Sequence, residues 1–103
     1  MTDTIRLTVA QAIVRWLLAQ HIDIDGTRTR ICGGGFGIFG HGNVPCLGEA
    51  LYPVRDQLPL YRGQNETSMG FAAAGYAKYH LRRRFMFCTA SAGPGTANLL
   101  TAA

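Results

Sequence analysis

What the sequence lacks excludes several kinds of site. The three cysteines, Cys32, Cys46 and Cys88, form no C-x-x-C pair and have no histidine at ligand spacing. Neither a zinc site nor a disulfide framework is therefore expected, and we predict buried thiols instead. No apolar run approaches the ~20 residues of a membrane span, and the N-terminus lacks the pattern of a secretion signal. We expect a soluble, cytoplasmic protein without a membrane partner.

Charge is scarce and unevenly placed. Charged residues make up 16% of the 103 residues, and the net charge of +4 comes largely from the arginines at 82–84. No aromatic residues alternate with these arginines, as nucleic-acid interfaces often require. A solvated turn between a helix and a strand explains the run better. We therefore expect no nucleic-acid partner.

Glycine is abundant, with 13 residues, which indicates tight turns and close approach of the backbone to other groups. Residues 35–40 satisfy the bare G-x-G-x-x-G pattern of dinucleotide sites, although Phe36 and Phe39 are typical of a strand interior. The acidic residue expected about twenty positions later is met only loosely, by Asp56. A nicotinamide or flavin site is thus one alternative. The sequence has no Gly-Lys-Ser/Thr, so a P-loop is excluded.

Helical and strand patterns alternate along the chain. A capping box at Thr8 and an apolar stripe predict a helix over 8–20, followed by a polar link over 23–30. Further helices are expected over 47–52, closed by Pro53, after Asn65, and after the turn at 93–95. Parallel strands are expected near residues 29–39, 58–61 and 85–89. This order predicts an α/β fold, a parallel sheet with flanking helices whose strands end at one edge.

The last helical pattern is still running at Ala103, with no capping residue. Three parallel strands also make a thin sheet with exposed edges, whereas parallel sheets normally have both faces covered. We therefore expect residues 1–103 to be the N-terminal portion of a larger domain.

Residues 64–77 place one carboxylate at the start of a helix that is otherwise small and apolar. Asn65 can cap this helix, so that Glu66 falls in the first turn. The small residues at 72–75 (Ala-Ala-Ala-Gly) and the scarcity of charged residues predict a helix buried on most sides. Glu66 either complements the helix dipole or serves as a functional carboxylate, and its position alone leaves both open.

Two further glycine-bearing turns follow the other strands. One contains His41, Gly42 and Asn43, and the other contains Ser91 and Gly93. Ligands of open α/β sheets bind at the carboxyl ends of the strands, and helix N-termini can hold an anion or a polar ring edge. The alternatives are two ordinary tight turns, with the histidine solvated. We expect His41, Ser91 and Glu66 to cluster at one edge of the sheet.

The two glycine-bearing turns and the helix with Glu66 resemble, in order, spacing and residue type, the pyrimidine-binding domain of thiamine-diphosphate enzymes. The resemblance covers most of the chain. The segments that carry the resemblance are residues 39–42, 65–77 and 93–99. A narrower resemblance points to family members that open a cyclic 1,2-dione in myo-inositol catabolism, and it rests on residues 5–12, 23–26, 38–44 and 58–61. Acetolactate synthases resemble the chain around Glu66 and Gly93 but not at 41–43.

The resemblance implies that Glu66 is the catalytic carboxylate. In the family it hydrogen-bonds N1′ of the cofactor's aminopyrimidine and promotes the tautomer that takes the C2 proton. It also implies that thiamine diphosphate is bound by six residues of this chain: His41, Gly42, Asn43, Glu66, Ser91 and Gly93. The implied reaction is hydrolytic cleavage of a carbon–carbon bond in a cyclic dione.

The resemblance further implies that Mg²⁺ and the diphosphate are held by a separate domain, so no metal ligand is expected here. Each site would lie between two subunits of a homodimer or tetramer. Residues 1–103 alone are expected to be inactive. An acetolactate-synthase-like carboligase and a non-catalytic α/β interaction module are the alternatives.

The chain departs from the family at two positions that concern orientation of the cofactor ring. Gln64 stands where a basic residue is usual, and Thr67 stands where the family commonly has Gln.

Overall fold

A computed structural model describes residues 4–38, 43–90 and 94–103. Its elements follow in the order α1 (Val9–Ala19), β1 (His21–Ile24), β2 (Thr27–Arg30), β3 (Cys32–Gly37), η1 (Asn43–Gly48), α2 (Glu49–Leu51), η2 (Tyr52–Val54), β4 (Leu60–Arg62), α3 (Glu66–Tyr79), β5 (Phe85–Thr89) and α4 (Pro94–Ala102). None of the helices in these ranges has the length and apolar character needed to cross a bilayer.

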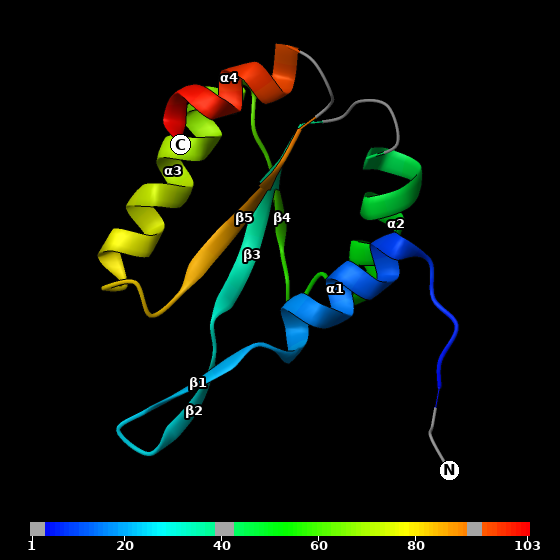
Figure 1. Cartoon of the computed structure of the whole chain (residues 1–103), viewed down its shortest axis with the longest axis vertical. Coiled ribbons are helices and arrows are strands. Elements are labelled where there is room, and N and C mark those ends of the chain that lie inside the picture. Colours follow the sequence, from blue (N-terminus) through cyan, green and yellow to red (C-terminus); the bar gives the residue numbers. More distant parts are fainter. Residues whose placement is uncertain (1–3, 39–42, 91–93) are drawn as a thin grey trace.

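The centre of the fold is a parallel sheet in the order β4-β3-β5. Helices α1 and α2 lie on one side of it and α3 and α4 on the other (Figure 1). Side chains of β5 point alternately to the two sides of the sheet. Phe85 and Phe87 pack on the core beneath α1 and α2, whereas the Cys88 thiol donates to the Met69 carbonyl of α3 at 3.6 Å. The predicted α/β class, with a parallel sheet and flanking helices, is confirmed.

Helix α1 begins where the sequence predicts, because its capping box forms. The Thr8 backbone N–H donates to Gln11 Oε1 at 3.0 Å, and the Gln11 N–H donates to Thr8 Oγ1 at 3.1 Å. The buried face carries Val14 and Leu17, which join the core. Most of the apolar residues that predicted the helix do not lie on this buried face: Val9 and Trp16 are 78% and 60% exposed. The small sheet covers one face of a helix whose apolar surface is wider than that face.

The polar link expected over 23–30 is in fact part of a β-hairpin. Strands β1 and β2 pair antiparallel, with Ile24 opposite Thr27, and they project from the sheet at the end away from α4 (Figure 1). The turn residues Asp25 and Gly26 have φ angles of 51° and 82°, the left-handed pair that a two-residue hairpin turn needs. The single strand expected near 29–39 is therefore divided at Ile31, between β2 and β3.

The helix expected over 47–52 is part of a longer helical segment of mixed geometry. It opens as the π-helical turn η1, tightens into α2 and ends as the 3₁₀ turn η2. Pro53 lies inside η2, directly after the α-helical residues. Because proline has no N–H to donate, the α-helical ladder stops there, as predicted. Leu51 of α2 is buried in the core.

Burial of α3 on most sides is not what the structure shows. Of its 14 residues only Met69 is buried, and Phe71 is 58% exposed. A β-carbon built on Gly75 would meet nothing within 4 Å. Within the described residues, β5 and α4 cover one side of the helix and leave the small-residue side open. The expectation of burial was wrong because small size permits close packing but does not supply the surface to pack against.

The cysteines differ in environment. All three are free thiols; Cys32 is buried, Cys88 is half-buried and Cys46 is exposed, so the expectation of buried thiols was wrong for Cys46. Burial raises the pKa of the Cys32 thiol, although a backbone hydrogen bond at Gly34 and the charges of Arg84 and Arg30 oppose that shift. Burial also raises the pKa of Cys88.

Candidate active site

The three parallel strands end side by side. Gly37, the last residue of β3, pairs with Arg62 of β4 and with Thr89 of β5, the last residues of those strands. The ladder continues one residue further, because the Gly63 N–H donates to the Gly37 carbonyl at 2.9 Å. Helix α3 begins shortly after β4, and α4 shortly after β5. The starts of both helices therefore follow this edge of the sheet.

Asn65 explains why α3 begins where it does. Its backbone is extended, with φ −149° and ψ 133°, and its side-chain oxygen accepts from the N–H groups of Thr67 at 2.9 Å and Ser68 at 3.2 Å. Two of the N–H groups that a helix start leaves unpaired are thereby satisfied. Glu66 becomes the first helical residue, as predicted.

The Glu66 side chain is half-buried at the start of α3. Across residues 4–38, 43–90 and 94–103, its carboxylate has no hydrogen-bond or ion-pair partner. The Glu66 oxygens are not among the buried side-chain atoms without a partner, which in the described residues are Arg30 Nε and Arg84 Nε, so the carboxylate reaches the surface of the chain. This carboxylate is therefore available to a polar group that is not part of the described chain.

Helix α4 is tied to the same turn of α3. The Thr67 hydroxyl donates to the backbone carbonyl of Asn98 at 2.7 Å, a contact between residues 31 positions apart. This bond joins the residue directly after Glu66 to the middle of α4.

The other predicted site residues lie mostly outside the described ranges. His41, Gly42, Ser91 and Gly93 belong to that group, and of Asn43 the structure describes the backbone alone, as the first residue of η1. Their predicted clustering with Glu66 thus stays a prediction. The structure does place the strand ends that flank both turns at the edge where α3 begins.

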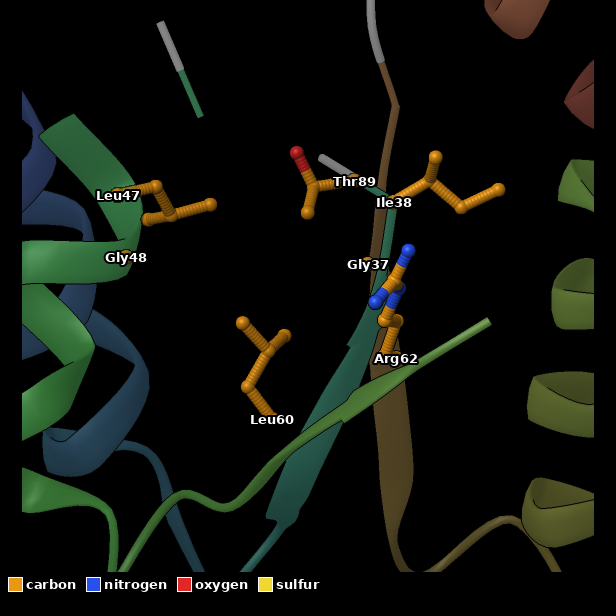
Figure 2. Close-up of a pocket in the computed structure, with 7 residues that line it drawn as sticks. All are labelled: Gly37, Ile38, Leu47, Gly48, Leu60, Arg62 and Thr89. Atoms are coloured by element: carbon orange, nitrogen blue, oxygen red, sulfur yellow. The ribbon is translucent and has the colours of Figure 1, made fainter. Parts of the chain in front are cut away.

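A small apolar pocket opens at the same edge (Figure 2). Its volume is about 80 Å³, and it is lined by Gly37, Ile38, Leu47, Gly48, Leu60, Arg62 and Thr89. Figure 2 shows the Leu47 and Leu60 side chains facing the space between η1 and the sheet. The pocket therefore lies on the α2 side, whereas Glu66 begins the helix on the opposite side. A larger, open depression of about 590 Å³ shares Leu47 and Thr89 and runs along the first turns of α1 and α2.

Of these lining residues, Gly37 and Ile38 belong to the glycine pattern at 35–40, whereas Leu47, Arg62 and Thr89 were not predicted as site residues. Arg62 and Thr89 could have been found, because each ends a parallel strand, where ligands of open α/β sheets bind. Leu47 could not, because its place depends on how η1 packs against the sheet. Among the described residues, no three His, Cys, Asp or Glu side chains are grouped so that they could hold a metal ion.

Comparison with known proteins gives a consistent result. The family model described as thiamine pyrophosphate enzyme, N-terminal TPP binding domain, matches residues 30–103. A 3D-(3,5/4)-trihydroxycyclohexane-1,2-dione hydrolase of Listeria monocytogenes is 50% identical over 104 residues, which cover 100% of this chain. Its counterpart from Lacticaseibacillus casei is 52% identical over 101 residues, or 98% of the chain. The chain spans 16% of the length of each of these relatives. No solved structure gives a significant match.

Proposed function

Because this chain belongs to the family of thiamine pyrophosphate enzymes, through their N-terminal TPP-binding domain, we propose that it supplies Glu66 as the activating carboxylate of a longer enzyme. That enzyme would cleave a carbon–carbon bond in a cyclic 1,2-dione. The observation that carries the proposal is the state of Glu66. It is half-buried, first in its helix, next to the carboxyl edge of the sheet, and without a partner among the described residues.

Support for a cofactor role comes from Glu66, whose carboxylate suits one edge of the aminopyrimidine ring. A carboxylate without a partner can hold a proton shared with a ring nitrogen, which is the role that the family implies for Glu66. Exclusion of water by the bound cofactor and the rest of the enzyme would strengthen that hydrogen bond, because the surrounding dielectric would then be lower than that of water. When bound, thiamine diphosphate supplies the carbanion chemistry and stores the electrons of the broken carbon–carbon bond. The chain's own share is to hold the proton and orient the ring.

The relatives support the substrate class. Their names specify 3D-(3,5/4)-trihydroxycyclohexane-1,2-dione as substrate, and identity near one half extends over the whole of this chain. Mg²⁺ would be held, together with the diphosphate, by residues outside this chain. The turns at His41–Asn43 and Ser91–Gly93 would contribute to the cofactor site from the same edge as Glu66.

We also propose that the longer protein is a homodimer or tetramer in the cytoplasm. Three exposed apolar residues of α1, Val9, Ile13 and Trp16, support burial of this helix against further protein surface. Three free thiols, one of them exposed, suit a reducing compartment.

The test uses the full-length protein that contains this chain, stripped of cofactor. We expect the dione to be consumed, with formation of a ring-opened carboxylic acid, when thiamine diphosphate and Mg²⁺ are both added. Omission of thiamine diphosphate should abolish the reaction. An unchanged dione in the complete mixture would contradict the proposal. Condensation of two pyruvate molecules instead would identify the carboligase alternative.

A further inference from the structure

We propose that Thr67 is a positioning residue for Glu66: its hydroxyl fixes the first turn of α3 against α4, so that the carboxylate keeps one orientation. The proposal rests on the proposed function, because it assigns Thr67 a part in the reaction that Glu66 serves. It concerns a position at which this chain departs from the glutamine that the family commonly has.

Thr67 is held from two directions. Its backbone N–H donates to the Asn65 side chain at 2.9 Å, and its hydroxyl donates to the Asn98 carbonyl at 2.7 Å. The first bond is local and sets the helix start. The second is long-range and spans two helices. Glu66 lies between the cap and this tether, and its own side chain has no partner among the described residues.

A second contact between the helices lies one turn further along α3. A β-carbon built on Gly70 would stand 2.5 Å from the Ala102 β-carbon and 3.3 Å from Leu99 Cδ1. The two backbones thus approach closely here, and α3 cannot move nearer to α4. Close packing at Gly70 sets the spacing of the helices, and the Thr67 bond sets the rotation of the first turn. Together they determine where Glu66 points.

Threonine at 67 allows a clean test, because its partner is a backbone carbonyl that no side-chain substitution removes. Thr67→Val keeps the shape and the β-branching but deletes the donor. Thr67→Ser keeps the donor and deletes a methyl group. The pair therefore separates the hydrogen bond from the packing. Orientation matters for this purpose because a misplacement of about 1 Å in an active site can cost about 10²-fold in rate.

The experiment compares the two variants with the wild type in the full-length protein. For Thr67→Val we expect kcat to fall about fivefold to tenfold through partial misorientation of Glu66, less than the cost of about 10²-fold for a full misplacement of about 1 Å, with KM for the dione within about twofold. Amide hydrogen exchange at residues 96–102, measured without cofactor, should become faster. Thr67→Ser should stay within about twofold of the wild type in each measurement. A purely structural role would lower the melting temperature and leave kcat unchanged below it.

Two results would overturn the proposal. One is wild-type kcat in folded Thr67→Val; the other is unchanged exchange in α4, which would show that the bond does not hold the helices together. If the wild-type protein itself shows no cofactor-dependent turnover, the proposed function fails first, and the role assigned to Thr67 fails with it. The exchange measurement needs no cofactor, so in that case it still decides whether the tether exists.

Discussion

Gly70 of α3 and Ala102 of α4 lie so close that a β-carbon on Gly70 would stand 2.5 Å from the Ala102 β-carbon. Real β-carbons do not approach other atoms so closely, so Gly70→Ala must push the helices apart. We expect it to destabilise the protein by about 1–3 kcal/mol, the usual cost of overpacking, despite the higher helix propensity of alanine. Urea unfolding of the full-length protein measures the change.

Gly75 provides the matched control, because it lies in the same helix. A β-carbon there would meet nothing within 4 Å. Gly75→Ala should therefore be neutral or stabilising by up to about 1 kcal/mol. Equal effects at the two glycines would show that α3 and α4 do not pack as described.

The hairpin turn gives a second prediction. Gly26 has φ 82°, and a β-carbon there would meet nothing, so the cost of Gly26→Ala is conformational alone. We expect a loss of about 1–2 kcal/mol, because alanine disfavours the left-handed region. Asp25→Asn, at φ 51°, should be close to neutral, because asparagine tolerates that region. If Gly26→Ala unfolds at the wild-type urea concentration, the turn does not have this geometry.

The thiols give a prediction about pH. Burial raises the pKa of Cys32 in the folded state above its ordinary value. The unfolded chain then loses the thiol proton first as pH rises, so the stability that this group contributes is complete below the ordinary thiol pKa and is lost through the alkaline range. We expect the free energy of unfolding to fall with rising pH less steeply in Cys32→Ala than in the wild type. Parallel curves would contradict the burial of this thiol.

Exposure should also order the reactivity of the cysteines. Cys46 is exposed, whereas Cys32 is buried. Iodoacetamide followed by mass spectrometry should therefore modify Cys46 first and Cys32 only on unfolding, with Cys88 between them. Early modification of Cys32 would show that the core opens readily.

Local signals explain which parts of the fold were predictable. The capping box at Thr8 and the cap at Asn65 each involve residues within three positions of one another, and both form as predicted. The hairpin was missed although its signal is also local: Asp25-Gly26 stands between alternating segments, a strong indication of a two-residue turn. The polar composition of 23–30 favours a link and the Asp25-Gly26 turn favours a hairpin, and the turn prevails in the structure.

Other features depend on contacts that no local pattern encodes. Exposure of α3 could not be read from its small residues, since burial depends on which surfaces lie opposite. For the site, the position of Glu66 followed from Asn65 alone. Its tether from Thr67 to Asn98 spans 31 positions and required the packing of α3 on α4.

The catalytic role of Glu66 is tested most directly by its substitution with glutamine in the full-length protein. The amide keeps the size of the side chain but cannot act as a carboxylate, so turnover of the dione should fall by about 10²–10⁴-fold or more. Glu66→Asp should cost less, because the acid is retained with a shorter reach. A carboxylate that merely complements the helix dipole contributes about 0.3–1 kcal/mol of stability and nothing to chemistry. Wild-type kcat in Glu66→Gln, with a slightly lowered melting temperature, would show that Glu66 has no part in catalysis.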